Sequence, residues 1–459
     1  MLMSARLGFQ RGVGALAAAV SCGATFSFAE PARAFNTTTA SGYRPAKPFR
    51  VGVLGATGAV GQRFLEHLEG HPWFTVTRLG ASERSAGKAY ADAANWMVSP
   101  NVPSYLQGMR VVGCTPEDFG GEVDLVFSAL VRALRVRVLY RAPALLRPSP
   151  HSLPPMLPTP TIYATPLLQD APVAATVEPA FRDAGVPVFS NARNFRMTPD
   201  VPLVVPQVNG DHLAMVPGQA SFSTTGGYIV TNANCSTTGM VIALAPLQSA
   251  FGIEAVHATT LQAISGAGYP GLPSLDILDN VVPYISGEEE KLETEYAKIM
   301  GALSIAGKPA AITGPVDAKA SSGAAAIAHP GFPLSAMVNR VHVRDGHCIA
   351  LSVKLAKPAT PEQVAAVLEA WKPRDPEVSS LPSAPQAFIT VRKETNRPQP
   401  RLDRDTGSGY TTVVGRVRRD PVYTVKMFVL SHNTVMGAAG SSILNAELAA
   451  AKGLLKHKQ

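Results

Sequence analysis

Short apolar runs alternate with helical patterns along the first half of the chain. Runs at residues 49–54, 74–79, 123–129 and 186–190 are typical of buried strands, and residues 62–68 have a helical pattern directly after the first of them. This order of strand, turn and helix predicts parallel βαβ units and an α/β fold.

Three glycines occupy the first strand-to-helix turn, which reads Gly-Ala-Thr-Gly-Ala-Val-Gly over residues 55–61. Glycine at this spacing lets the backbone approach a pyrophosphate at a helix N-terminus, so the turn predicts a dinucleotide site; a tight turn that binds nothing is the alternative. The predicted cofactor-binding residues here are Gly55, Thr57, Gly58, Ala59, Val60 and Gly61.

The end of the second strand bears on which dinucleotide binds. Ser82, Arg84 and Ser85 follow this strand, and hydroxyl groups beside an arginine suit the 2′-phosphate of NADP. Glu83 is an acid of the kind that binds the ribose of NAD, and it weakens that preference. A later strand should bring Ser128 to the edge of the cofactor.

One cysteine lies where a strand-like run gives way to a helix-like run. Cys235 follows the apolar residues 228–230 and precedes the apolar residues 240–247. At such a junction the free N–H groups and the helix dipole can lower a thiol pKa and stabilise an oxyanion, which predicts a nucleophile. A small buried cysteine in a packed turn is the alternative.

Charge and cysteine usage exclude several classes of protein. The net charge is +8, but residues 1–50 and residues 131–169 each contribute +5, which leaves the remainder near −2. The rest of the chain therefore lacks the net positive charge that is typical of nucleic-acid-binding proteins. The four cysteines lie far apart and predict neither a disulfide framework nor a metal site.

The two basic segments are unusual in other ways. Residues 1–47 combine early arginines, an apolar run too short for a membrane span and a hydroxyl-rich stretch after Ala34. This pattern predicts a bipartite presequence for plastid import, with mitochondrial import or plain secretion as the alternatives. No membrane association is expected of the mature form. Residues 131–169 hold eight prolines and no acid, and predict an insertion or a retained intron.

Several motifs together resemble aspartate-semialdehyde dehydrogenase of the archaeal and fungal type. They are the glycine turn at 55–61, Ser-Asn-Ala-Arg-Asn-Phe-Arg-Met at 190–197 and Asn-Ala-Asn-Cys-Ser-Thr-Thr at 232–238. The likeness runs from about Pro48 to Leu448 and is interrupted only by residues 131–169. Without it, the arginines of the second motif are equally consistent with an anion site and with surface salt bridges.

The resemblance implies a role for each matching residue. Cys235 would attack the acyl phosphate and hold a thioester, His347 would act as acid and base, and Gln262 would orient the substrate. Ser265, Gly266 and Asn433 would lie by the cofactor. The implied substrate-binding residues are Arg196, Asn234, Glu288 (ammonium), Lys291 (phosphate) and Arg340 (carboxylate).

Two local patterns bear on these roles. Glu288 and Lys291 lie three residues apart and so share one face of a predicted helix, although an acidic run is usually a solvated helix start. Strand alternation would place Arg340, His342 and Arg344 on one face. Cys348 stands where the family usually has threonine.

We therefore predict a Rossmann-type doubly wound NADP-binding domain over residues 48–234, an α+β catalytic and dimerisation domain over 235–430, and a C-terminal helix within 431–459 that returns to the first domain. The expected reaction is NADPH-dependent reductive dephosphorylation of L-4-aspartyl phosphate to L-aspartate 4-semialdehyde and phosphate, in lysine, threonine and methionine biosynthesis, by a homodimer or homotetramer. A related acyl-phosphate reductase is one alternative. An inactive NADP-binding module is the other, if residues 131–169 disrupt the sheet.

Overall fold

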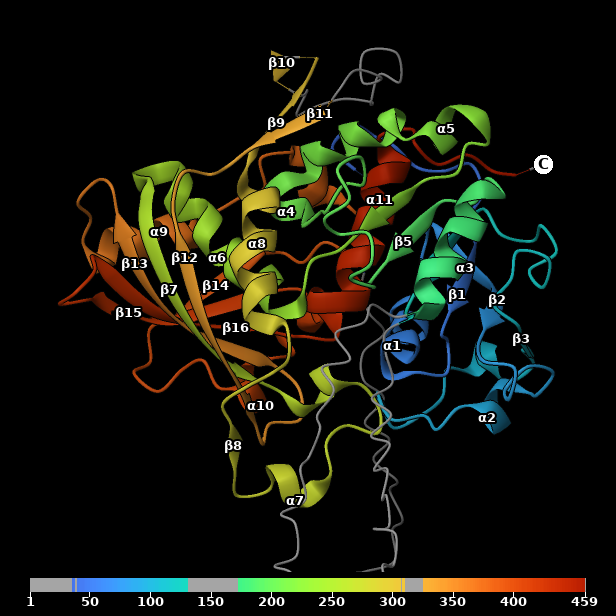
Figure 1. The fold of residues 1–459 in the computed structure, drawn as a ribbon, viewed down its shortest axis with the longest axis horizontal. Coiled ribbons are helices and arrows are strands. Elements are labelled where there is room, and N and C mark those ends of the chain that lie inside the picture. Colours follow the sequence, from blue (N-terminus) through green and yellow to red (C-terminus); the bar gives the residue numbers. More distant parts are fainter. Residues whose placement is uncertain (1–34, 38, 131–171, 307, 310–324, 459) are drawn as a thin grey trace, which may run out of the picture. The chain divides into compact units, whose positions relative to one another are not determined.

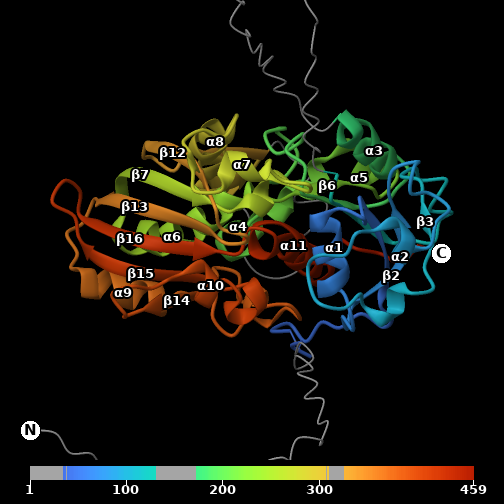
Figure 2. The ribbon, with the colours of Figure 1, turned by 90° about the horizontal axis from the view of Figure 1, so that it is seen from below.

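The structure is a computed structural model that describes residues 35–37, 39–130, 172–306, 308–309 and 325–458 (Figures 1 and 2). Residues 1–34 of the predicted presequence and the predicted insertion at 131–169 lie outside the described residues. Within the described part, no helix is both long and apolar enough to cross a lipid bilayer.

A six-stranded parallel sheet forms the N-terminal half of the fold, with strand order β3-β2-β1-β4-β5-β6. This order confirms the doubly wound α/β prediction, because the chain reverses direction across the sheet between β1 and β4. Its strands are β1 (Phe49–Leu54), β2 (Phe74–Gly80), β3 (Val111–Val112), β4 (Leu125–Ser128), β5 (Val188–Ser190) and β6 (Ile229–Thr231).

Helices cover both faces of this sheet because its strands are apolar on both sides. Helices α1 (Ala59–His67) and α11 (Gly440–Ala451) lie on one face, where Phe64 packs among Val51, Val53 and Phe127. On the other face α3 (Pro172–Asp183) packs Phe181 into a separate cluster of strand side chains. The C-terminal helix α11 thus returns to the first sheet (Figure 1).

The second half of the fold is built on a mixed seven-stranded sheet with order β14-β15-β16-β13-β7-β12-β8. Helix α6 (Cys235–Phe251) packs against β13 and β16, with α8 (Glu288–Met300) and α9 (Pro361–Glu369) on either side of it (Figure 1). The strands are β7 (Ile253–Gln262), β8 (Val281–Val282), β12 (Leu334–Val341), β13 (His347–Leu355), β14 (Ile389–Arg392), β15 (Thr412–Arg419) and β16 (Val425–Ser431).

The remaining elements are short. Three strands form a small antiparallel sheet: β9 (Ala302–Ile305), β10 (Lys308–Pro309) and β11 (Ala325–Ala328). The short helices are α2 (Tyr90–Ala93), α4 (Pro206–Asn209), α5 (Ala220–Thr224), α7 (Ser274–Ile277) and α10 (Pro400–Asp403).

Part of the predicted presequence belongs to the folded body of the protein. The backbone N–H of Asn36 donates to the carbonyl of Pro382 at 3.0 Å. Ser41 donates to the Glu377 carboxylate from its backbone N–H at 2.9 Å and from its hydroxyl at 2.7 Å. Asn36 and Ser41, which lie within the predicted presequence, thus bind the body of the protein, and the predicted boundary at residue 47 stays a prediction.

Replacing Glu377 with alanine tests this attachment. Because the carboxylate accepts two hydrogen bonds from Ser41, Glu377→Ala should lower the free energy of unfolding by about 1–3 kcal/mol and expose residues 35–43 to proteolysis. Denaturant unfolding and limited proteolysis measure the two effects. Glu369→Ala, at an exposed glutamate at the end of α9, is the matched control. Equal stability and equal proteolysis of the two variants would contradict the attachment.

Candidate active site

The start of helix α6 places Cys235 at the boundary between the two sheets. Strand β6 ends at Thr231, and Asn234 caps α6 by accepting hydrogen bonds from the N–H groups of Ser236 at 2.9 Å and Thr237 at 3.3 Å. An asparagine cap fixes where a helix begins. Cys235 is therefore the first residue of α6, as the sequence indicates.

The side chain of Cys235 lies against His347, the first residue of β13. Its Sγ is 3.0 Å from Nε2 of the imidazole, which is fully buried. The other ring nitrogen, Nδ1, accepts a hydrogen bond from the backbone N–H of Ala263 at 3.0 Å. A neutral imidazole carries only one proton, so the proton resides on Nε2 and is directed at the sulfur.

Burial keeps both members of this pair neutral. It raises the pKa of Cys235 to about 12, and Glu288 acts in the same direction. Burial also lowers the pKa of His347 to about 3, helped by the nearby Arg340. This desolvation opposes the lowering of the thiol pKa that the helix start predicts.

A ring of polar side chains connects the cysteine to helix α8. Asn234 donates from Nδ2 to Glu288 at 2.9 Å, and Glu288 forms an ion pair with Lys291 one turn later. Gln262 approaches the same carboxylate at 3.4 Å. Although burial opposes ionisation, Lys291 and Asn234 hold the pKa of Glu288 below its usual value, so the carboxylate is charged.

Arg196 reaches the site from the loop after β5. Its side chain is 9% exposed, and its guanidinium pairs with Glu295 of α8 at 2.9 Å and donates to the carbonyl of Asn191 at 2.9 Å. Its Nε–H is buried and has no hydrogen-bond partner among the described residues. The anion-site interpretation of this motif is therefore favoured over the surface salt bridge.

Arg340 and Gly266 close the opposite side. Arg340 is buried and donates to the carbonyl of Ala263 at 2.7 Å. A Cβ atom at Gly266 would lie 2.7 Å from the Arg340 guanidinium and 3.0 Å from the His347 ring, so a larger residue there would displace the Arg340 guanidinium. The predicted alternation is wrong beyond Arg340, because β12 ends at Val341 and the exposed His342 and Arg344 follow it.

The glycine turn has the geometry of a phosphate site. Gly55 has φ +75°, and a Cβ atom at Gly61 would lie 2.2 Å from the carbonyl oxygen of Gly55. Helix α1 starts after Gly58 with no side-chain cap among the described residues and no acid in its first turn. Its N–H groups therefore suit an anion. Thr57, Ala59 and Val60 lie within this turn and the first turn of α1.

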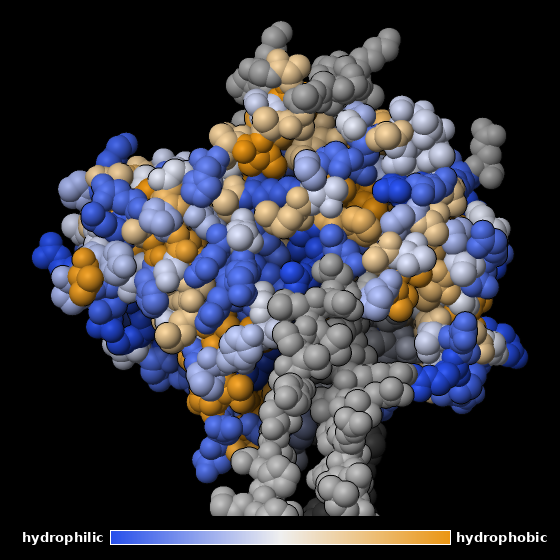
Figure 3. Space-filling view, viewed as in Figure 1, coloured by the Kyte–Doolittle hydropathy of each residue, from blue (hydrophilic) through white to orange (hydrophobic). Residues whose placement is uncertain are grey.

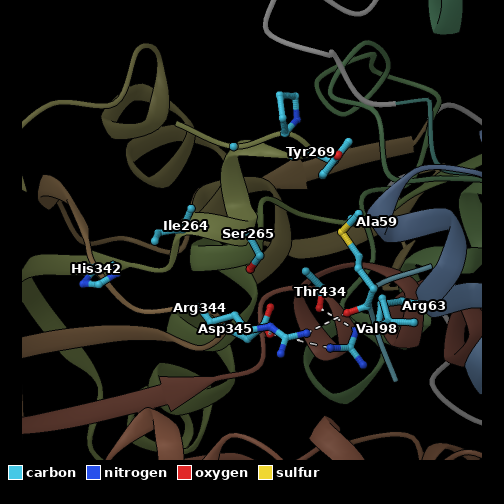
Figure 4. Close-up of a pocket in the computed structure, with 14 residues that line it drawn as sticks. Ala59, Arg63, Val98, Ile264, Ser265, Tyr269, His342, Arg344, Asp345 and Thr434 are labelled. Atoms are coloured by element: carbon cyan, nitrogen blue, oxygen red, sulfur yellow. Dashed lines mark hydrogen bonds and ion pairs between the residues drawn. The ribbon is translucent and has the colours of Figure 1, made fainter. Parts of the chain in front are cut away.

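A cavity of about 370 Å³ lies between α1 and the loops at 264–271 and 342–345 (Figure 4). Ala59 and Ser265, two predicted cofactor-binding residues, line it from opposite sides. Asn433 lies beside it, donates to the Ser265 hydroxyl at 2.8 Å and accepts from the Gly346 N–H at 2.8 Å. The cavity thus connects the glycine turn with the loop that precedes His347.

The remaining cofactor predictions fall at strand ends. Ser82, Arg84 and Ser85 follow β2, and Arg84 is exposed without a hydrogen bond or ion pair to any residue that the structure describes. Ser128, at the end of β4, has a fully buried side chain on the face of the sheet that Val126 shares, and its place at the cofactor stays a prediction.

Residues that sequence reasoning missed surround the site. Figure 4 shows Arg63, Asp345 and Thr434 in the cavity, where Arg63 donates to the Thr434 hydroxyl at 3.2 Å. Glu295 and Lys298 of α8 contact the Arg196 loop. Their spacing from Glu288 and Lys291, seven residues in each case, places them on the same helix face and is visible in the sequence. Over the described residues, no group of three His, Cys, Asp or Glu side chains could hold a metal ion.

Two families of protein domain match the chain. Residues 50–138 and 167–216 match the semialdehyde dehydrogenase NAD binding domain, and residues 244–436 match the semialdehyde dehydrogenase dimerisation domain. Among curated proteins, the chain is 43% identical over 411 residues to aspartate-semialdehyde dehydrogenase of Schizosaccharomyces pombe. This alignment covers 88% of this chain and 99% of the relative. The enzyme of Archaeoglobus fulgidus is 41% identical over 400 residues, covering 87% and 97%.

Solved structures show the same likeness. Aspartate-semialdehyde dehydrogenase of Candida albicans, solved with NADP, superimposes with a TM-score of 0.69 at 40% identity over 89% of this chain and 100% of that chain. Aspartate-semialdehyde dehydrogenase II of Vibrio cholerae, solved with ASA, gives 0.59 at 26% identity over 88% and 99%. The chain belongs to the aspartate-semialdehyde dehydrogenase family.

Proposed function

We propose that the chain reduces L-4-aspartyl phosphate with NADPH to L-aspartate 4-semialdehyde and phosphate, a step of lysine, threonine and methionine biosynthesis. The observation that carries this function is the Cys235 thiol, 3.0 Å from the His347 imidazole. Buried cationic and anionic side chains surround the pair. A thiol beside such a set can accept an acyl group from a charged acyl phosphate.

The dinucleotide supplies a hydride when it is bound. The glycine turn at 55–61 fits its pyrophosphate, because only glycine allows this close backbone approach and the helix start is free of acids. Arg84 and the neighbouring Ser82 and Ser85 fit the 2′-phosphate that distinguishes NADP from NAD. The ratio of KM values for NADP and NAD in Arg84→Ala tests this preference; an unchanged ratio would exclude Arg84 from it.

Cys235 forms the bond to the acyl carbon as the bond from that carbon to phosphate breaks. Because Nε2 of His347 already carries a proton, it donates to the sulfur and stabilises negative charge there rather than removing the thiol proton. That proton passes to an oxygen of the leaving phosphate, which balances the step. After reduction of the thioester, the thiohemiacetal anion collapses to the aldehyde, the same N–H stabilises the departing thiolate, and a proton taken up from solvent restores the thiol.

Four charged residues fix the substrate's orientation. Glu288 suits the ammonium group, Arg340 the α-carboxylate, Lys291 the phosphate, and Arg196 an anionic group of the substrate. Gln262 and Asn234 orient the carbonyl and the nucleophile beside the Glu288 carboxylate. A charged Glu288 favours a substrate with a free ammonium over the acylated amine of a related acyl-phosphate reductase.

The enzyme acts as a homodimer, a proposal that the match to a dimerisation domain supports. Leu275, Leu278, Val281 and Tyr284 are exposed around β8, the last strand of the mixed sheet. Figure 3 shows the apolar side chains of this region at its lower left. Sedimentation velocity of Leu275→Asp tests the interface: it should shift the enzyme toward monomers, and an unchanged dimer would place the interface elsewhere.

Two further proposals concern residues 131–169 and the predicted presequence. The domain match stops at residue 138 and resumes at residue 167, which supports an insertion or a retained intron within 131–169. Sequencing the mature messenger RNA tests the intron, which is excluded if most transcripts contain these codons. Import into a plastid, with a mitochondrion as the alternative, is tested by fusing residues 1–47 to a fluorescent protein; a cytosolic signal would exclude both.

The reaction itself is tested by phosphate-dependent reduction of NADP with aspartate semialdehyde. Cys235→Ala should lose at least about 10³-fold in kcat/KM, because no other group can form the thioester. Cys348→Ser and Cys114→Ser are matched controls, since Cys348 packs with Val413 and Leu430 on the face of β13 opposite His347, and the Cys114 thiol approaches the Ala81 carbonyl. Both should stay within about threefold of the unsubstituted chain. Activity that survives in Cys235→Ala would exclude the mechanism, and an inactive parent chain would favour the NADP-binding module.

The neutral thiol and imidazole predict a distinctive pH dependence. Because the pKa of Cys235 is raised to about 12, its thiolate fraction should rise about tenfold per pH unit between pH 7 and 9. Alkylation by iodoacetamide, followed by mass spectrometry of the Cys235 peptide, should accelerate accordingly without a plateau. A rate independent of pH between 6 and 8 would instead show a resting thiolate–imidazolium pair.

A further inference from the structure

One face of helix α8 carries four charged side chains toward the catalytic centre. Glu288, Lys291, Glu295 and Lys298 are spaced three, four and three residues apart, which places them in one row along the helix. The first two surround the proposed substrate. The second two contact only protein groups, and the proposed function assigns them no role.

Glu295 joins two parts of the site that come from different elements. Its Oε1 pairs with the Arg196 guanidinium at 2.9 Å, and its Oε2 accepts a hydrogen bond from the backbone N–H of Asn234 at 2.6 Å. The carboxylate is 2% exposed. One rigid group on α8 therefore sets the distance between the anion-binding arginine and the residue that precedes the nucleophile.

Lys298 holds the loop that carries the same arginine. Its ammonium donates three hydrogen bonds, to the carbonyl oxygens of Arg196 at 2.8 Å, Thr198 at 2.7 Å and Val201 at 2.8 Å. An ammonium has three N–H donors, so this arrangement uses all of them. The loop is thus fixed at three points along its length, independently of Asn234.

These contacts hold the Arg196 guanidinium in one orientation and leave one of its N–H donors available. Nη1 is taken by Glu295 and Nη2 by the carbonyl of Asn191, whereas Nε–H is buried without a partner among the described residues. A buried N–H without a partner costs free energy unless a ligand accepts from it. An anionic oxygen is the acceptor that suits a guanidinium.

We propose that Glu295 is a positioning residue: it holds Arg196 and the start of α6 in register, so that the Arg196 Nε–H receives an anionic oxygen of the substrate while Cys235 faces the acyl carbon. Lys298 supports the arginine side of this arrangement alone. The inference rests on the proposed function, because the anion is either the phosphate or the carboxylate of that substrate.

The test compares Glu295→Gln, Lys298→Met and the control Glu290→Gln, an exposed glutamate on the same helix. Steady-state assays with the full chain measure KM for phosphate, semialdehyde and NADP separately, and iodoacetamide alkylation reports on Cys235. Glu295→Gln should raise KM for one anionic substrate about tenfold or more, leave KM for NADP within about twofold and change the alkylation rate of Cys235. Lys298→Met should raise the same KM without changing alkylation.

The arms of the experiment separate the possible results. A rise in KM for phosphate assigns the Arg196 donor to phosphate, and a rise in KM for semialdehyde assigns it to the carboxylate; either supports the proposal. Glu295→Asp keeps the charge, but its side chain is too short to span both partners. It should therefore recover less than half of the kcat/KM that Glu295→Gln loses relative to the unsubstituted chain. A merely structural Glu295 would lower kcat and thermal stability with every KM unchanged, which would overturn the proposal. A parent chain without phosphate-dependent activity would overturn the function instead.

Discussion

The start of helix α6 at Asn234 is the constraint on which the rest of the site depends. The Asn234 side chain caps the helix through the N–H groups of Ser236 and Thr237, and its amide also donates to Glu288. Its backbone N–H donates to Glu295. Because Asn234 contacts the start of α6, Glu288 and Glu295, small movements of α6 would displace Cys235, the proposed nucleophile, from both carboxylates at once.

This arrangement explains how a thiol of raised pKa can serve as a nucleophile. The protein keeps Cys235 and His347 uncharged at rest, since charge in this buried place is costly. It provides instead a fixed N–H at the sulfur, held by the Ala263 backbone, and fixed cations for the anionic substrate. Donors that need no rearrangement stabilise developing charge more effectively than mobile solvent does.

Local patterns in the sequence predict the first sheet and the chemistry of the site, but not its electrostatics. Strand lengths, the glycine turn and the position of Cys235 before α6 follow from apolar periodicity and turn residues, and the spacing of Glu288 and Lys291 places them on one helix face. The raised pKa of Cys235 does not follow, because it depends on burial by residues distant in sequence, such as His347. The contacts of Glu295 and Lys298 likewise do not follow from the sequence, because their partners are loop carbonyl and backbone N–H groups that the fold brings next to them. The strand end at Val341 and the attachment of Ser41 to Glu377 are tertiary effects of the same kind.

The central claim is that the acyl group passes through Cys235, and trapping the intermediate tests it most directly. The enzyme is mixed with aspartate semialdehyde and NADP without phosphate, quenched in acid and digested for mass spectrometry. The account predicts an aspartyl adduct on the Cys235 peptide that hydroxylamine removes and that is absent when phosphate is added before the quench. An adduct on another residue, or NADPH formed in a burst with Cys235 unmodified, would contradict it.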